Sequence, residues 1–358
     1  MTPVPDPSPL LAPDAPLEVL AARTLFEGPS VRRRGFPSIV RLPGGRLLLA
    51  FMAGTGPELR DDAAVMLSHS DDNGETWDEP FPLYASPGWN SVPMGGLAQI
   101  DGDHVQLMLG RIKQDLTLAG DEPITDWFMA AIDSRDGGQT WSDVGPEISL
   151  FPTWTEMYGA SNPHRLSDGR LLWAVIGTVG RDVEWQSGVT FSDANGEGFT
   201  PPVLIGAAAD RNFADTDLVR LPDGRFLAVM REMITRQSHQ AWSSDEGRTW
   251  TPIRPTGFRG SNTKLFPLRS GAVLCAYRDE DPARRGVSLS LSEDGGETWR
   301  SAGQLYAAPT DARHLPGSVC GYPDIVSLGG DEIAAVLHSY PGPDGRMSIQ
   351  FLRLRDRS

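Results

Sequence analysis

Short apolar runs recur along the chain, and each follows a turn that contains glycine. The runs RLLLAF, RLLWAVIG, RFLAVM and AVLCAY are examples. Apolar runs of this length, bounded by Gly, Pro and Asp, predict β-strands. Six turns of this kind mark the chain, namely Leu42–Gly45, Ile100–Asp103, Leu166–Gly169, Leu221–Gly224, Leu268–Gly271 and Leu328–Asp331.

A second repeat has the form S-x-D-x-G-x-T-W. It occurs five times, at Ser70–Trp77, Ser134–Trp141, Ser192–Phe199, Ser243–Trp250 and Ser292–Trp299. The third copy keeps the Ser and the Gly but has lost the Asp, the Thr and the Trp. Asp and Ser side chains bond nearby backbone amides, and Gly supplies a positive φ, so the phrase predicts a tight hairpin. The copies lie about 50 to 65 residues apart, a spacing typical of four-stranded propeller blades.

Together the two repeats predict an all-β protein, a six-bladed β-propeller of four-stranded antiparallel blades. The sixth blade has only the run MSIQFLRLR left at its C-terminus. We therefore expect residues 17 to 28 to supply its outer strand and to close the ring, which removes an exposed sheet edge. The predicted organisation is a Pro-rich tail at residues 1–16 and one propeller at residues 17–358.

The net charge of −15 argues against nucleic acid or an anionic membrane as a general partner. Cys275 and Cys320 each precede or lie in an apolar run, which favours two buried thiols over a disulfide. The N-terminus has neither a basic segment nor a long apolar stretch. This favours a cytoplasmic protein, or a secreted one whose signal has been removed. The oligomeric state stays open.

The propeller topology divides the polar residues between two ends. Because each blade is an antiparallel meander, the glycine turns and the Asp phrases share one end. The other end holds the starts of the inner strands and the loops between second and third strands. It collects carboxylates, a phenol and guanidiniums, at Asp61, Asp62, Asp215, Asp217, Arg231, Arg278, Arg284, Arg285, Tyr322 and Asp324. Such groups suit the hydrolysis of an acidic sugar, although surface loops are commonly polar in any case.

At these positions the chain resembles the sialidase (neuraminidase) superfamily of six-bladed propellers with Asp-box (BNR) repeats, over residues 17 to 358. The segment Tyr322–Leu328 keeps the spacing of the family's nucleophile phrase. The resemblance implies that Tyr322 is the nucleophile. Asp215 stands six residues before the leucine of the fourth turn, where the family has its activating glutamate.

The resemblance also implies residues that hold the substrate. Arg231 ends the strand after the fourth turn, and Arg284 or Arg285 opens the third strand of blade five. Two guanidiniums would hold a substrate carboxylate through paired hydrogen bonds. A protonated Asp61 or Asp62 would assist the departure of the leaving group.

A phenol nucleophile suits a sugar that carries a carboxylate on its anomeric carbon, because an anionic nucleophile would be repelled. The phenol has an ordinary pKa of about 10, so it requires an adjacent base, here the Asp215 carboxylate. Tyr nucleophiles are an exception to the two-carboxylate scheme of glycosidases. The resemblance thus implies a retaining exo-glycosidase that acts on a terminal sugar of the sialic-acid type.

Two positions depart from the family pattern. Gly35 stands where the family has its first clamp arginine, and Arg34 would replace it only after a one-residue shift. Asp215 is one methylene shorter than glutamate, and a misplacement of about 1 Å can cost on the order of 100-fold in rate. Two alternatives stay open: a propeller glycosidase or lyase for another sugar such as a uronide, and a non-catalytic propeller that binds a glycan or a protein. The sequence has no metal-ligand spacing or nucleotide fingerprint, so no cofactor is expected.

Overall fold

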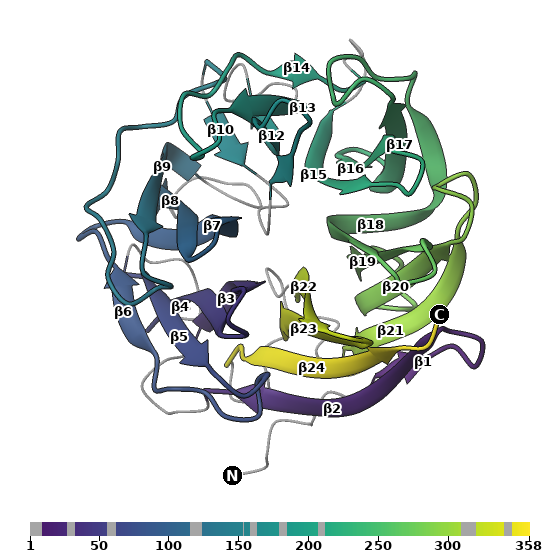
Figure 1. The fold of residues 1–358 in the computed structure, drawn as a ribbon, viewed down its shortest axis with the longest axis horizontal. Helices are drawn as coiled ribbons and strands as arrows, with labels where there is room; N and C mark the ends of the chain where they lie inside the picture. Colours follow the sequence, from purple (N-terminus) through teal and green to yellow (C-terminus); the bar gives the residue numbers. More distant parts are fainter. Residues whose placement is uncertain are drawn as a thin grey trace.

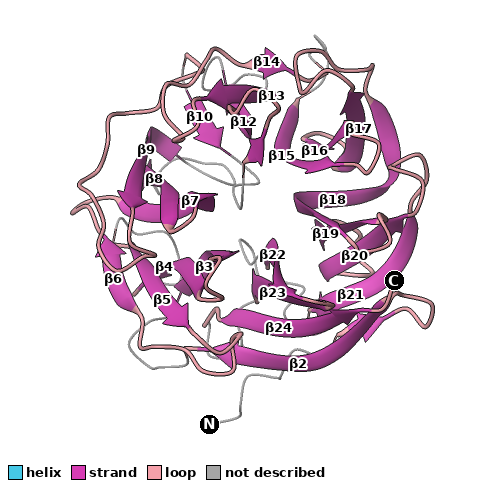
Figure 2. Ribbon diagram, viewed as in Figure 1, coloured by secondary structure: helices cyan, strands magenta, loops and turns pink. Residues whose placement is uncertain are grey.

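The computed structural model describes residues 9–26, 33–55, 62–114, 124–152, 154–157, 163–178, 185–206, 212–308, 320–339 and 346–358. Within these ranges the regular structure consists of β-strands, which Figure 2 shows joined by loops around one axis. The strands pair in antiparallel fashion, so the predicted all-β antiparallel fold is confirmed. The described residues contain no helix with the length and hydropathy needed to cross a membrane.

Three sheets contain the first half of the chain. The sheet β3-β4-β5-β6 comprises Arg33–Arg41, Leu47–Gly54, Ala64–Ser70 and Phe81–Tyr84. The sheet β7-β8-β9 comprises Asn90–Asp101, His104–Gln114 and Ile124–Ser134. The third sheet contains β10 to β14, at Trp154–Met157, His164–Arg165, Leu171–Thr178, Trp185–Ser192 and Val203–Leu204.

Two further sheets contain the second half. The larger one runs from β15 to β21, at Phe213–Arg220, Phe226–Glu232, Gln237–Ser243, Arg254–Pro267, Val273–Asp279, Gly286–Ser292 and Arg300–Ala307. Its edge strand beside β21 is β1, Leu10–Leu11. The last sheet has the order β2-β24-β23-β22, at Leu17–Leu25, Ile349–Asp356, Glu332–His338 and Gly321–Gly329.

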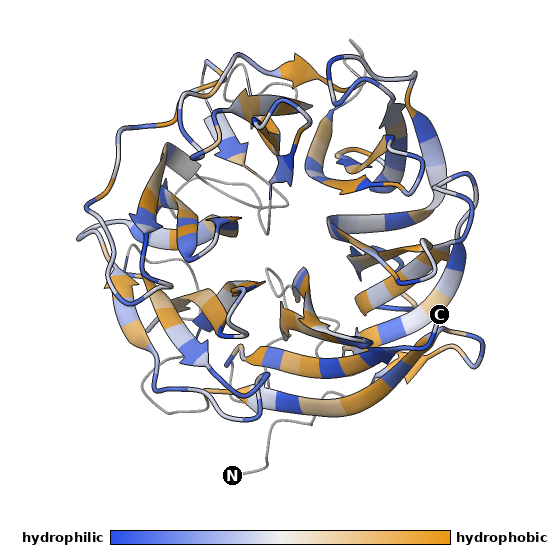
Figure 3. Ribbon diagram, viewed as in Figure 1, coloured by the Kyte–Doolittle hydropathy of each residue, from blue (hydrophilic) through white to orange (hydrophobic). Residues whose placement is uncertain are grey.

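The sheets follow one another around a central axis in chain order, with β3, β7, β15, β18 and β22 innermost (Figure 1). Apolar and polar residues alternate along many of the strands (Figure 3). The apolar side chains form separate cores between neighbouring sheets: Leu48 and Leu107 share one, and Leu172 and Phe226 share another. The core that contains Phe51 and Phe351 joins the first sheet to the last. The hydrophobic stabilisation is therefore spread around the axis rather than concentrated in one centre.

Strand β18 belongs to two meanders. Its first half pairs with β17, with Arg254 opposite Gln240, and its second half pairs with β19, with Leu265 opposite Cys275. The described residues consequently form five hydrogen-bonded sheets. The count of six blades stays a prediction.

The N-terminal strand β2 closes the last sheet. It runs antiparallel to β24, with Leu17 opposite Asp356 and Leu25 opposite Ile349, which confirms the predicted pairing beside the C-terminal strand. Part of the predicted tail also contributes, because Leu10 pairs with Gln304 of β21. The N-terminal segment thus connects the two last sheets.

The Asp phrases form the predicted hairpin turns. In the fourth copy the Asp245 carboxylate accepts hydrogen bonds from the amide and hydroxyl of Thr249 at 2.8 and 2.6 Å and from Ser243 at 2.8 Å. Equivalent bonds occur in three other copies, at Asp72, Asp136 and Asp294. In the third copy, the carboxylate of Asp193 takes the place of the missing Asp of the repeat. It accepts a hydrogen bond from the amide of Glu197 at 3.0 Å. This substitution explains how the degenerate copy keeps its turn.

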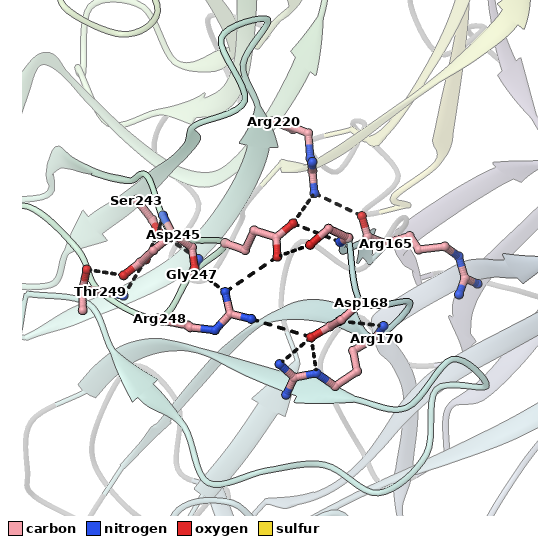
Figure 4. A network of polar contacts seen from close by, with 11 residues as sticks. Arg165, Asp168, Arg170, Arg220, Ser243, Asp245, Gly247, Arg248 and Thr249 are labelled. Carbon is pink, nitrogen blue, oxygen red and sulfur yellow. Dashed lines mark hydrogen bonds and ion pairs between the residues drawn. The ribbon is translucent and has the colours of Figure 1, made fainter.

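The turns also connect neighbouring sheets. Figure 4 shows the fourth Asp phrase beside the glycine turn of the preceding sheet, Leu166–Gly169, where Arg248 approaches Asp168 at 3.6 Å. The Glu246 carboxylate accepts hydrogen bonds from the amide and the hydroxyl of Ser167, at 3.0 and 2.9 Å. Gly247 has a φ of 87°, and a Cβ there would lie 2.9 Å from Leu172 of the preceding sheet. Glycine is required at this position by both its conformation and its packing.

Both cysteines are buried free thiols, as predicted.

Replacement of Asp245 by Ala should lower the free energy of unfolding by about 1–2 kcal/mol, because it removes bonds within one turn. Chemical denaturation of both proteins measures this loss, with Ser244→Ala as the control in the same turn. A variant of unchanged stability would show that the carboxylate does not hold the hairpin.

Candidate functional site

Four residues of the innermost strands have a left-handed backbone conformation although none is glycine. Phe36, Asp215, Asn262 and Tyr322 have φ angles of 51°, 51°, 52° and 48°. Each lies in a β-bulge of its strand, and each stands six residues before the leucine of the next glycine turn. Such a conformation costs on the order of 1–3 kcal/mol for a residue with a side chain. Because this cost recurs at one level of four strands, we take that level as the candidate site.

The residues two positions further along these strands bond to one another around the axis. This inner ring consists of Ser38, Asp217, Lys264 and Asp324, and all four are buried. The Lys264 ammonium lies 3.3 Å from Asp324 Oδ1 and 4.0 Å from Asp217 Oδ2. The Ser38 hydroxyl donates to Asp324 Oδ2 at 3.0 Å. The inner ring therefore joins β3, β15, β18 and β22 next to the left-handed residues.

Burial and charge act against each other in the inner ring. Burial raises the pKa of Asp217 to about 6, although Lys264 and the Leu265 amide favour its charged form. Burial lowers the pKa of Lys264, but Asp217 and Asp324 outweigh this effect, and the pKa is raised overall. The ring thus contains a stable cation, Lys264, and a carboxyl group, Asp217, whose pKa is raised to about 6.

Asp215 is held in a fixed orientation. Its Oδ2 atom lies 2.9 Å from Arg231 Nε and accepts a hydrogen bond from the Asn262 amide at 3.0 Å. Its backbone carbonyl accepts a bond from the Thr263 hydroxyl at 2.9 Å. The structure therefore brings together two residues that the sequence predicted, Asp215 and Arg231, and anchors them on the neighbouring strand β18.

A second guanidinium and a second carboxylate lie beside this pair. Arg278 and Glu280 come from the end of β19 and from the residues just after it, and Arg278 Nε donates to the Ser261 hydroxyl at 2.8 Å. Glu280 Oε1 lies 3.5 Å from Arg278 Nε and 4.0 Å from Arg231 Nη1. Burial lowers the pKa of Arg278, but the charges of Glu280, Tyr322 and Asp215 outweigh it and raise that pKa. These groups consequently form one electrostatic cluster.

Tyr322 lies at the edge of this cluster and is half-buried. Its ring packs against Phe36 at a centroid distance of 4.4 Å and against His338 at 5.6 Å. The Tyr322 phenol is also one of the groups that raise the pKa of Arg278. The side of the site next to Gly35 is therefore lined by aromatic rings.

The other predicted site residues lie elsewhere or remain untested. Asp62 is exposed and accepts a bond from the Thr55 amide at 3.3 Å, whereas Asp61 lies outside the described residues. Arg34 is buried on β3, opposite Ala53. Arg284 is paired with Asp279 at 3.3 Å, with 47% of its side chain exposed.

Arg285 lies close enough to Cys320 to influence that thiol. Burial raises the pKa of Cys320 to about 12, while Arg278 and Arg285 oppose the rise. The roles that the sequence suggested for Asp61, Asp62, Arg34, Arg284 and Arg285 stay predictions.

Sequence reasoning missed Glu280 and assigned no role to Arg278. The signal was present, because both lie where β19 ends, in the phrase Arg278-Asp-Glu280 on the correct end of the blade. It also missed Asn262, which stands at the same spacing as Asp215 and Tyr322 in the intervening blade. Among the residues described, no group of three His, Cys, Asp or Glu side chains is arranged to hold a metal ion.

Residues 117–334 match the model of the BNR repeat-like domain family. Because this match covers more than half of the chain, the protein belongs to that family, and the predicted membership in a BNR-repeat family is confirmed. No curated protein matches the sequence.

Several solved structures share the fold. A protein of unknown function from Dyadobacter fermentans has a TM-score of 0.77 and 20% identity, covering 95% of this chain and 99% of that one. The NanB sialidase of Streptococcus pneumoniae has a TM-score of 0.66 and 15% identity, covering 94% and 70%. An α-L-arabinanase of Penicillium chrysogenum, complexed with arabinobiose, has a TM-score of 0.61 and 15% identity, covering 93% and 98%. At these identities the similarity establishes a β-propeller-type fold.

Replacement of Asp217 by Asn should change how stability depends on pH. A carboxyl group whose folded pKa is about 6, against about 3.9 when unfolded, stabilises the fold below pH 4 and loses that contribution as the pH rises to 6. We expect the stability difference between wild type and variant to shift by on the order of 2 kcal/mol across this window.

Denaturant unfolding at pH 4, 5, 6 and 7 measures this shift. His164 contributes the opposite slope, because burial lowers its pKa to about 4, but it is common to both proteins and cancels in the comparison. A difference that stays constant between pH 4 and 7 would refute the assignment.

Proposed function

We propose that this BNR repeat-like protein is a retaining exo-glycosidase on a closed six-bladed propeller. Tyr322 would be the nucleophile, Asp215 the base, and the substrate a terminal sugar of the sialic-acid type. The observation that supports this most is the placement of Tyr322 and Asp215 at equivalent left-handed positions of two inner strands. Strained backbone of this kind clusters at active sites.

The proposed reaction has two displacements. The Tyr322 oxygen attacks the anomeric carbon while Asp215 accepts the phenol proton, and the bond to the leaving group breaks. A protonated Asp62 or Asp61 supplies a proton to the departing oxygen. Water then attacks the glycosyl-tyrosine, losing a proton to the same aspartate, and Tyr322 leaves as its proton returns from Asp215. Two inversions give retention of configuration.

Two guanidiniums support an acidic substrate. Arg231 and Arg278 lie in the same cluster as Asp215 and have little exposed side-chain area, at 10% and 15%. Buried guanidiniums form stronger bonds to a carboxylate than exposed ones, because the local dielectric constant is lower. In this proposal Arg278 takes the role that the sequence gave to Arg284 or Arg285.

A neutral sugar is the second candidate, and a specific observation favours it. Gly35 supplies no arginine, and the aromatic ring of Phe36 packs against Tyr322 on that side. Arg231 and Arg278 both have protein carboxylates nearby. An arabinanase, complexed with the neutral sugar arabinobiose, is among the proteins of similar fold. A panel of aryl sialosides, uronides and neutral glycosides, including arabinosides, would distinguish these substrates.

On the substrate that this panel identifies, Tyr322→Phe should reduce turnover by several orders of magnitude without loss of fold. The turnover of Asp215→Ala should fall by a similar factor. The turnover of the double variant should be little lower than that of either single variant, because nucleophile and base act as a unit. Steady-state kinetics and circular dichroism measure the two effects, with Tyr84→Phe on the outer strand β6 as control. Additive losses in the double variant, or a Tyr322→Phe variant that retains its turnover, would exclude this mechanism.

A further inference from the structure

Glu280 faces more positive charge than any other carboxylate of the site described above. Its Oε1 atom lies 3.5 Å from Arg278 Nε and 4.0 Å from Arg231 Nη1, and it accepts a hydrogen bond from the Ser261 hydroxyl. Burial would raise the pKa of Glu280, but Arg278, Ser261, Arg231 and Arg236 together lower it. Glu280 is therefore an anion paired with two guanidiniums, and a third, Arg236, also favours its charged form.

Glu280 is more exposed than the two arginines beside it. The exposed side-chain fractions are 24% for Glu280, 15% for Arg278 and 10% for Arg231. An anion that approaches the two arginines consequently comes close to the Glu280 carboxylate, which lies within 4.0 Å of both. Asp215, the other carboxylate paired with Arg231, has only 7% of its side chain exposed.

We propose that Glu280 determines specificity by occupying the position between Arg231 and Arg278 that a substrate carboxylate would take. The inference rests on the proposed function for the location of the site only; among the two substrates considered there, it favours the neutral sugar over the acidic one. With Asp215, Glu280 supplies two negative charges against three guanidiniums. A substrate carboxylate that binds these arginines must displace the Glu280 carboxylate or bind against its repulsion. A neutral sugar carries no charge and meets no such repulsion.

The charge arithmetic sets the expected size of the effect. Two unit charges about 5 Å apart, at an effective dielectric constant of about 20, interact strongly enough to change a binding constant by on the order of 100-fold, and partial exposure reduces this. Replacement of Glu280 by Gln keeps the size and a hydrogen-bond acceptor but removes the charge. We therefore expect affinity for acidic sugars to rise by about 10- to 100-fold.

The test is isothermal titration of wild type and Glu280→Gln with free N-acetylneuraminic acid, D-glucuronic acid and L-arabinose. The dissociation constants of both acids should fall in the variant, while that of arabinose should stay unchanged. Glu232→Gln is the matched control, because Glu232 directly follows Arg231 in the chain but bonds to its own turn, at the amides of Ile234 and Thr235. Glu232→Gln should leave the dissociation constants of all three sugars unchanged.

A second variant guards against loss of fold, since removal of Glu280 leaves buried guanidiniums without its charge. Ser261→Ala keeps the charge but removes the hydroxyl that holds Oε1, so it should give a smaller gain in acid affinity, of several-fold. Acid affinities that do not change in either variant would overturn the proposal. A gain shared equally by arabinose would overturn it as well, because it would mean that only steric access had changed.

These outcomes are separate from those of the proposed function. Binding is measured without turnover, so a gain in acid affinity supports the role of Glu280 even where no glycoside is cleaved. Conversely, cleavage of acidic glycosides by the wild type with unchanged affinities in the variants refutes the role of Glu280 alone.

Discussion

The ion pairs of Lys264 with Asp217 and Asp324 hold the centre of this protein together. They link three inner strands that belong to different parts of the chain, and Ser38 extends the connection to a fourth. Removal of one partner from a buried ion pair destabilises the fold far more than the net contribution of the pair suggests, because the other partner is left as an uncompensated buried charge. Around a propeller axis, where apolar cores lie between sheets and not at the centre, such polar connections fix the distance between strands.

The position of the proposed reacting groups follows from this ring. Asp215 and Tyr322 precede the ring carboxylates Asp217 and Asp324 by two residues, and both have a backbone conformation that an isolated strand would not adopt. The surrounding bonds offset this strain: the Asn262 amide and Thr263 hydroxyl fix Asp215, and rings pack around Tyr322. Preorganisation of this kind lets polar groups act without rearrangement during a reaction.

Much of this organisation could be predicted from the sequence, because turns and hairpins depend on local chemistry. The Asp phrases and the pairing of β2 with β24 required only repeat counting. The charged cluster was predicted in part: Asp215 and Arg231 meet, but Glu280 was missed, because its role depends on the packing of β19 against its neighbours. Spacing within one blade does not reveal which of several loop arginines approaches the axis, and Arg284 pairs with Asp279 instead.

The pairing of β2 with β24 has a consequence for biosynthesis. Glu18 and Arg355 lie opposite each other although they are 337 residues apart. At ordinary rates of synthesis, β2 waits for its partner on the order of tens of seconds. During that time it is an unpaired strand, the kind of segment that aggregates with other chains. Glu18 and Arg23 interrupt its apolar residues with charge, and charges within an apolar strand oppose aggregation of that kind.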